Sequence, residues 1–115
     1  MSEIKDDKYY LSRMLHYSML IEAYYKVLMR HGKNMTADDQ ESDGIIFKFN
    51  QLREEAKPYL RNHSVLSQHI TLLIRFRNKI IHDYDNVTYS FFDEIIVNDI
   101  PKLIVILENC LKEAM

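Results

Sequence analysis

The stretch YLSRMLHYSMLIEAYYKVL, residues 10–28, decides the fold class. Its apolar side chains return every three or four residues, which is the repeat of one face of an α-helix. A second apolar row widens this face, so we expect the helix to be buried against two neighbours. The first row is Tyr10, Met14, Tyr17, Ile21, Tyr24 and Leu28, and the second is Leu11, Leu15, Met19 and Leu20. The pattern predicts a long helix over roughly residues 7–31.

The segments that follow predict a second helix after a polar connection. Gly32 is a suitable C-cap for the first helix, and residues 32–43 are nearly free of apolar side chains, which is typical of an exposed loop. The second helix is expected to begin at Asp43 or Gly44 and to kink or end at Pro58. Its core-facing row is Ile45, Phe49, Leu52, Ala56 and Tyr59.

Three more helices are expected in the C-terminal half. The third starts at the capping residue Ser64 and runs to about residue 84. A short fourth helix covers residues 89–97, and the last begins afresh at Asp99 and Pro101. With only two glycines and two prolines in 115 residues, the chain predicts an all-α, compact bundle of about five helices that forms a single domain over residues 1–115.

Composition narrows the classes of function. The net charge of −2 excludes a generically basic nucleic-acid binder, so any contact with RNA needs a local patch. Cys110 is the single cysteine, and no apolar run approaches the length of a membrane span. We therefore expect a cytoplasmic protein. The five histidines lack the helical spacing of a zinc site, so no metal and no cofactor are expected.

Polar side chains interrupt the apolar pattern at RNKIIHDY, residues 77–84. Arg77 stands where the row Leu66, Ile70, Leu73 calls for another apolar residue. Asn78 and His82 are four apart and share a helix face. Arg77 and His82 are five apart, which is about 140° around an ideal helix. They meet only if the helix ends near His82 or if a second copy of the chain supplies one of them.

Each of these residues also has a purely structural explanation. Arg77 can pair with a buried glutamate, such as Glu54 or Glu55, or lie across a dimer interface. His82 can be a favourable charge at a helix C-terminus. Tyr84 can be a core aromatic whose hydroxyl reaches the surface. Taken one at a time, none of them requires a catalytic role.

Taken together, the residues resemble the signature of HEPN-domain proteins, in particular the HepT-like toxins. The family motif is an arginine, four residues, a histidine, one residue and a tyrosine, usually with an asparagine after the arginine. The resemblance extends through RNKIIHDYDNVTYSFFDEIIVNDIPKL, residues 77–103, and through IIFKFNQLREEAKPYL, residues 45–60, which includes Glu55–Ala56. It covers most of the chain and implies the same five-helix layout.

The resemblance implies a metal-independent endoribonuclease that cleaves RNA. Arg77 would bind the phosphate and stabilise its charge in the transition state, for which a guanidinium is suited. His82 would act as general acid and base near neutral pH. Asn78 would orient the phosphate or His82, and Tyr84 would donate a hydrogen bond beside the site. No metal enters this chemistry.

The resemblance also implies partners. Two chains would pack as a homodimer with their motifs facing one cleft, and Arg75 and Lys79 are candidate RNA contacts. A nucleotidyltransferase antitoxin of the MNT type would modify Tyr84 with AMP and block the site. Two alternatives stay open: a non-catalytic module that dimerises and partners the nucleotidyltransferase, and an unrelated bundle in which Arg77→Leu stabilises the fold.

Overall fold

The computed structural model describes residues 7–36, 38–61 and 89–114, and this part of the chain is helical apart from short connections. Its elements are α1 (Asp7–Arg30), α2 (Gln40–Arg61), α4 (Tyr89–Glu94), the π-helix η1 (Ile95–Asp99) and α5 (Ile100–Ala114). The all-α prediction is confirmed for these residues. The expected third helix, over residues 64–84, lies outside them.

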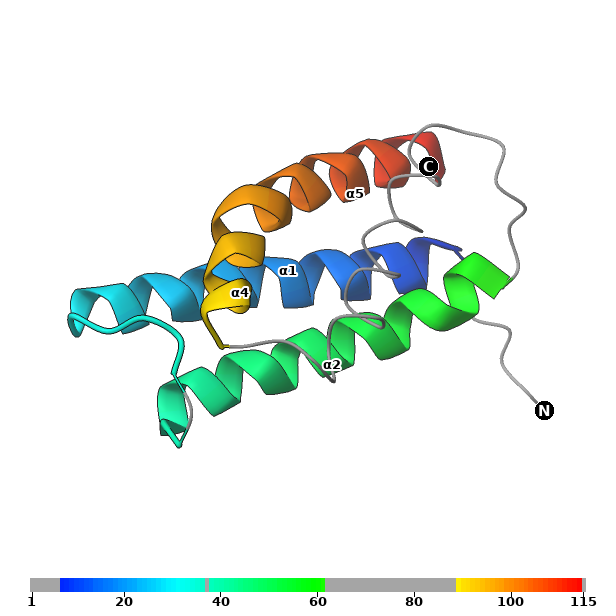
Figure 1. Cartoon of the computed structure of the whole chain (residues 1–115). Coiled ribbons are helices and arrows are strands. Elements are labelled where there is room, and N and C mark those ends of the chain that lie inside the picture. Colours follow the sequence, from blue (N-terminus) through cyan, green and yellow to red (C-terminus); the bar gives the residue numbers. More distant parts are fainter. Residues whose placement is uncertain (1–6, 37, 62–88, 115) are drawn as a thin grey trace.

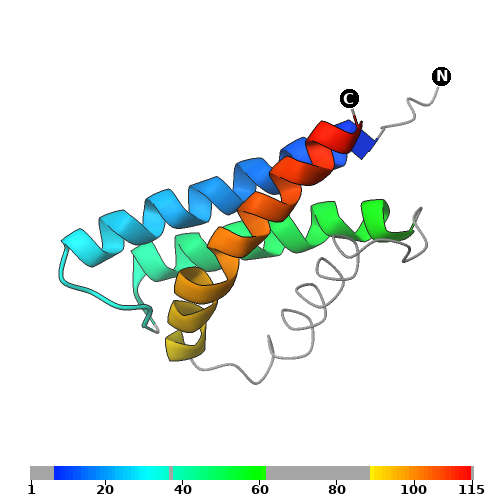
Figure 2. The same ribbon diagram turned by 90° about the horizontal axis from the view of Figure 1, so that it is seen from above.

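Helix α1 lies at the centre of the described part. It packs along α2 on one side and against α5 on the other (Figure 1). Seen from above, α5 runs obliquely across the α1–α2 pair, and α4 lies at the end where the α5 ribbon begins (Figure 2). Two packing partners explain why α1 carries so broad an apolar face. None of the described helices is long and apolar enough to span a membrane.

The buried face of α1 is rotated slightly from the one that the sequence predicts. Met14, Ile21 and Leu28 are buried as expected, but Tyr24 is 45% exposed and its neighbour Tyr25 only 8%. Met19, in the second predicted row, is 55% exposed. The first predicted row and the buried row both alternate steps of three and four and share Met14, Ile21 and Leu28, but the other three buried positions each lie one residue later than predicted. The buried positions are Leu11, Met14, Ser18, Ile21, Tyr25 and Leu28.

Ser18 explains why the apolar repeat did not predict the buried face of α1 correctly. Its side chain is fully buried, although a serine does not count as apolar in a periodicity analysis. The hydroxyl donates a hydrogen bond to the carbonyl of Met14 at 2.8 Å. A buried hydroxyl that finds such a partner one turn back is satisfied within its own helix. A small polar residue can therefore occupy the core row.

The end of α1 follows the prediction for Gly32. Gly32 has a φ of 70°, the left-handed conformation that glycine adopts without strain. Its N–H donates to the carbonyl of Met29 at 2.9 Å, and the N–H of Lys33 donates to Leu28 at 3.2 Å. These two bonds form a Schellman motif, which satisfies the last carbonyls of the helix.

The connection after α1 is shorter and better anchored than a polar loop over residues 32–43. Helix α2 already begins at Gln40, where Asp39 accepts hydrogen bonds from the N–H and the hydroxyl of Ser42 at 3.0 and 2.9 Å. An aspartate in this role is a strong N-cap. Met35 is 4% exposed and joins the core. The prediction of a start at Asp43 or Gly44 was wrong because the capping signal lies upstream of the apolar repeat.

Helix α2 runs past Pro58 to Arg61, so the helix does not end at the proline, which was one of the two expected effects. A proline in the last turn removes one hydrogen bond near an end where bonds are already lost, which limits its effect. All five residues of the predicted core row of α2 are buried, and Phe49 is fully inaccessible.

The expected helix start at Asp99 and Pro101 agrees with the first residue of α5, Ile100, but α4, η1 and α5 follow one another without a break. The N–H of Ile100 donates to the carbonyl of Ile95, five residues back. Such a π-turn inserts one residue into a helix, so the consecutive residues Ile95 and Ile96 are both buried. Pro101 follows the widened turn, within the first turn of α5, where its missing N–H has little cost.

Candidate active site

The six residues of the predicted site lie outside the described residues. They are Arg75, Arg77, Asn78, Lys79, His82 and Tyr84, all within residues 62–88. Their mutual geometry, and the meeting of Arg77 with His82, therefore stay predictions. The described helices define the two ends of this segment. It leaves α2 at Arg61 and joins α4 at Tyr89, five residues after Tyr84.

The downstream end is anchored through Asp93 of α4. The same carboxylate oxygen, Oδ1, accepts two hydrogen bonds. One comes from the hydroxyl of Tyr25 at 2.7 Å, and the other comes from the N–H of Met35 at 3.1 Å. Tyr25 belongs to α1 and Met35 to the connection before α2, so a single carboxylate joins three parts of the chain. Phe92, beside Asp93, packs its ring 5.1 Å from that of Phe49 in α2. Polar and apolar contacts together hold α4 against the α1–α2 pair.

The tyrosine in this contact is a committed donor. Burial, the hydrogen bond to Asp93 and the charge of that carboxylate together raise the pKa of Tyr25 to about 12. The phenol therefore keeps its proton at all physiological pH values. A hydrogen bond between a neutral donor and an ionised acceptor is stronger than one between two neutral groups. Tyr25 and Asp93 form a structural contact with no proton to exchange.

The upstream end, on α2, presents a second polar cluster. Arg13 of α1 donates from Nε to Glu55 at 3.2 Å and from Nη2 to the hydroxyl of Tyr17 at 2.9 Å. Its guanidinium also lies over the Tyr17 ring, 5.2 Å from the centroid. The Glu55 side chain is 16% exposed. The cluster links α1 to the part of α2 that the sequence analysis quoted.

The structural explanation for Arg77 named Glu54 and Glu55 as possible partners. In the described residues Glu55 pairs with Arg13, and Glu54 lies 3.2 Å from Lys57 and 3.5 Å from Arg53. Both carboxylates thus have cationic partners on α1 or α2. These contacts leave the role of Arg77 itself open, because Arg77 lies outside the described part.

Comparison with known protein families shows which family this chain belongs to. The sequence profile described as Ribonuclease HepT-like matches residues 2–110, nearly the whole chain. The chain belongs to this family. No protein of curated function and no solved structure shows a significant match. The matched range includes the whole of RNKIIHDY and the described helices as far as Cys110 in α5.

No pattern in the sequence predicts the residues that hold α4 in this HepT-like chain. Asp93 falls within the quoted C-terminal stretch, but no repeat or spacing singles it out, and its partners are 68 and 58 residues away. The sequence offered one signal of this contact: the consecutive residues Tyr24 and Tyr25 lie in α1, and only one of them can face the core. Contacts across such distances depend on how the helices pack, which periodicity along one helix does not encode.

Proposed function

We propose that the chain is a metal-independent endoribonuclease and the toxin component of a HEPN/MNT toxin–antitoxin system in the cytoplasm. The observation that carries this proposal is the family match over residues 2–110, which contains the complete motif from Arg77 to Tyr84. Family membership supports an RNase of the HepT-like kind. The residue roles, the partner and the toxin activity are our inference from the motif.

In the proposed reaction a 2′-hydroxyl of the RNA loses its proton and attacks the adjacent phosphorus. The bond from phosphorus to the 5′-oxygen of the next nucleotide breaks, that oxygen takes up a proton, and a 2′,3′-cyclic phosphate remains. His82 moves the protons, because imidazole titrates near neutral pH. Arg77 binds the phosphate oxygens as their negative charge grows, and its planar fork can hold two of them. Asn78 orients the phosphate or His82, Tyr84 donates a hydrogen bond, and Arg75 with Lys79 contacts the RNA backbone.

The arrangement of the site follows from the spacing of the motif. We propose that residues 64–84 form the third of five helices and that two chains pair so that their motifs face one cleft. A dimer cleft accommodates Arg77 and His82, which diverge by about 140° on one straight helix. An MNT-type nucleotidyltransferase would then attach AMP to Tyr84, and the added phosphate beside Arg77 would exclude RNA.

The test is cleavage of a fluorescent single-stranded RNA by the purified chain in the presence of EDTA. His82→Ala should lower the initial rate by at least about 100-fold, the usual contribution of a general acid–base group. The matched control is His16→Ala, since His16 is exposed on α1. Both variants should keep the circular dichroism spectrum and the melting temperature of the parent.

Three results would contradict the proposal. Cleavage that needs a divalent ion, or that survives His82→Ala, removes the catalytic assignment. A chain that cleaves no RNA but co-purifies with its nucleotidyltransferase is the non-catalytic module instead. An Arg77→Leu variant that melts at a higher temperature and loses no activity indicates a structural arginine in an apolar row. For Tyr84, the check is a mass increase of one AMP group on co-expression, absent in Tyr84→Phe.

A further inference from the structure

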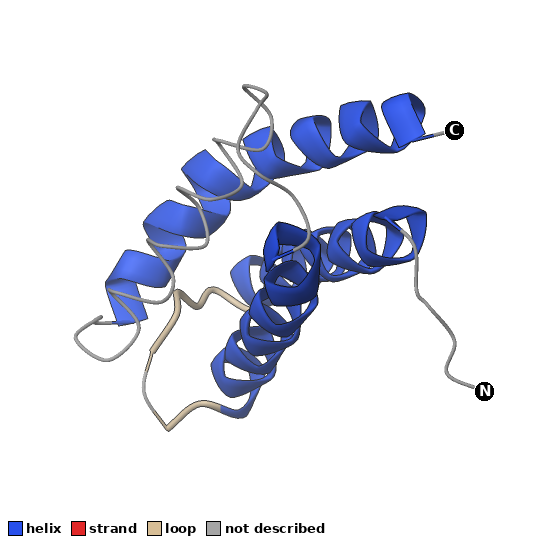
Figure 3. Ribbon diagram, turned by 90° about the vertical axis from the view of Figure 1, so that its right-hand side faces the viewer, coloured by secondary structure: helices blue, strands red, loops and turns tan. Residues whose placement is uncertain are grey.

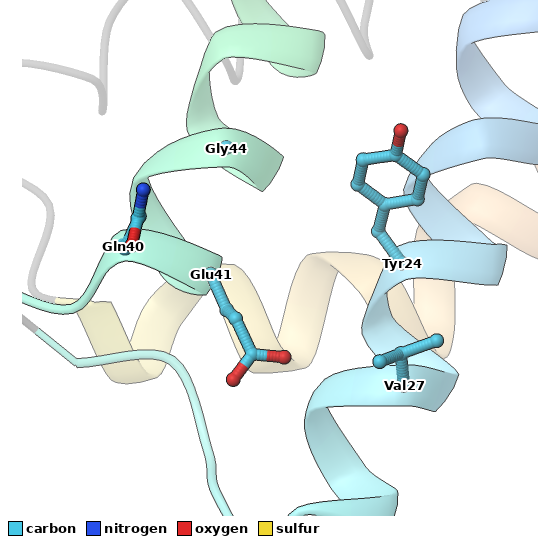
Figure 4. Close-up of a pocket in the computed structure, with 5 residues that line it drawn as sticks. All are labelled: Tyr24, Val27, Gln40, Glu41 and Gly44. Carbon is cyan, nitrogen blue, oxygen red and sulfur yellow. The ribbon is translucent and has the colours of Figure 1, made fainter.

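A groove on the other side of α1 has no part in the contacts described so far. It is a pocket of about 290 Å³ between the C-terminal half of α1 and the first turns of α2. Tyr24 and Val27 line it from α1, and Gln40, Glu41 and Gly44 line it from α2. The close-up shows the Tyr24 and Val27 side chains on one wall and the side chain of Glu41 reaching toward them from the other (Figure 4). We call this pocket the α1–α2 groove.

Gly44 is what leaves the groove open. It lies inside α2 without a positive φ, and a Cβ built on it would meet nothing within 4 Å. Neither backbone conformation nor local crowding therefore calls for glycine, although glycine inside a helix costs about 0.5–1 kcal/mol relative to alanine. The effect of the missing side chain is to leave space between the two helices. A space kept at some cost in stability is suited to an incoming group.

The rim of the groove is apolar and exposed. Tyr24 is 45% exposed, Val27 38% and the nearby Phe47 55%. Large apolar side chains on two adjacent helices are typical of a surface that is covered by a partner. The volume is close to the lower limit for a drug-sized ligand, and it suits one bulky side chain better.

The charges on the rim are not balanced. At one end the carboxylate of Glu41 is neutralised, because it contacts Nζ of Lys33 at 2.8 Å and Nδ1 of His31 at 2.8 Å. At the other end the Lys48 ammonium lies over the rings of Tyr24 and Phe47, at 5.3 and 5.5 Å from their centroids. Within the described residues Lys48 pairs with no carboxylate. A group that enters the groove therefore meets an unneutralised cation.

We propose that the α1–α2 groove is a docking site for a segment of a partner protein. The segment inserts one bulky apolar side chain beside Gly44 and places a carboxylate against Lys48. A protein segment fits better than RNA, since one lysine and an aliphatic wall at Val27 are a poor platform for a polyanion, and the whole chain carries a net charge of −2. This inference is independent of the proposed ribonuclease activity.

The test uses two fluorescein-labelled helical peptides of equal length with the full chain. Both carry phenylalanine and leucine one turn apart on an alanine-rich helix, with glutamates next to them in one peptide and lysines in the other. Fluorescence anisotropy should show that the glutamate peptide binds more tightly. Gly44→Leu, which fills the groove, should weaken its binding by about tenfold or more. Lys48→Glu should weaken it by about threefold to fivefold and improve binding of the lysine peptide.

A matched control separates the groove from general stickiness. Val105→Ser removes an equally exposed apolar side chain from α5 and should leave peptide binding unchanged. Melting temperatures show whether each variant folds, and Gly44→Ala adds only the Cβ for which the structure has room. It should bind with intermediate affinity.

Other outcomes overturn the proposal. If neither peptide binds at millimolar concentration, the groove is not a docking site. The same conclusion follows if the affinity of the peptides is unchanged by both Gly44→Leu and Lys48→Glu. If a labelled single-stranded oligouridine binds instead and loses affinity in Phe47→Ala, the aromatic rim stacks bases. If the chain sediments as a dimer that Gly44→Leu dissociates, the occupant is a second copy. RNA cleavage, measured in parallel, tests the proposed function separately from the groove.

Discussion

Two sides of α1 differ sharply although two consecutive residues define them. Tyr25 is almost completely buried and donates to Asp93, which also accepts from the connection before α2. Tyr24 is nearly half exposed, lines the α1–α2 groove and has the Lys48 ammonium over its ring. Among the described residues, every regular element is a helix, and short connections make up the rest (Figure 3).

The comparison shows that the residues packed around each tyrosine determine the role of its side chain. The same phenol is a structural donor where helices close over it and an exposed aromatic wall where they do not. Burial without a partner would cost about 1–3 kcal/mol at Tyr25, so Asp93 is part of the reason why that register is stable. Nothing of the kind constrains Tyr24. Three predictions test this contrast, beginning with the largest effect.

Removing the Asp93 carboxylate, which Tyr25 and Met35 share as an acceptor, should destabilise the folded protein. Asp93→Ala leaves the Tyr25 hydroxyl and the Met35 N–H without their acceptor, and we expect a loss of about 2–4 kcal/mol in the free energy of unfolding. Urea titration followed by circular dichroism measures it. Asp93→Asn keeps an oxygen acceptor and should recover part of the loss, and Glu94→Ala, at the exposed next position, should change little. Equal stability of Asp93→Ala and Glu94→Ala would show that the contact contributes nothing.

Removing one hydroxyl at a time compares the two sides directly. Tyr25→Phe loses the 2.7 Å bond to Asp93 and should lower the free energy of unfolding by about 1–2 kcal/mol. Tyr24→Phe keeps the ring that lines the groove and should stay within about 0.5 kcal/mol of the parent. Thermal melts of the two variants give the comparison. Similar losses for both would mean that burial does not distinguish these tyrosines.

The smallest effect concerns the charged contacts at the end of the groove. Lys33 lowers the pKa of Asp39 and of Glu41, with further lowering from Ser42 and His31 respectively. A carboxyl group whose pKa is lowered by folding stabilises the protein above its unfolded-state pKa, and this contribution is lost as pH falls through the folded value. The parent should therefore lose more stability between pH 7 and pH 2 than Lys33→Met does.

The measurement is urea unfolding of both proteins across that pH range. Lys102→Met, which removes an exposed lysine from α5, is the matched control and should follow the parent. If Lys33→Met and the parent have parallel stability curves, the contacts of Lys33 with Asp39 and Glu41 are fully screened by solvent.

Local signals predicted much of the fold and failed at particular places. The repeat in residues 10–28 predicted helix α1 correctly, and Gly32 caps the C-terminal end of this helix as expected. Both signals act within one or two helical turns. Pro58 did not end α2, because it lies in the last turn of that helix. The last helix starts at Ile100, next to the predicted Asp99 and Pro101, but it follows a π-turn and not a break in the chain's helical run. For the candidate site, the sequence supplied the motif from Arg77 to Tyr84 and the family match contains it, but its geometry is untested.

The sequence by itself determined the helical class of the described residues, the core rows of α1 and α2 within one position, and membership of the HepT-like family. These depend on the identity of neighbours three or four residues away. Only the tertiary structure decided that Tyr25 and not Tyr24 is buried, that Asp93 joins three segments and that a groove lies between α1 and α2. Those features arise where helices meet, and contacts between residues far apart in sequence leave no periodic trace along either helix.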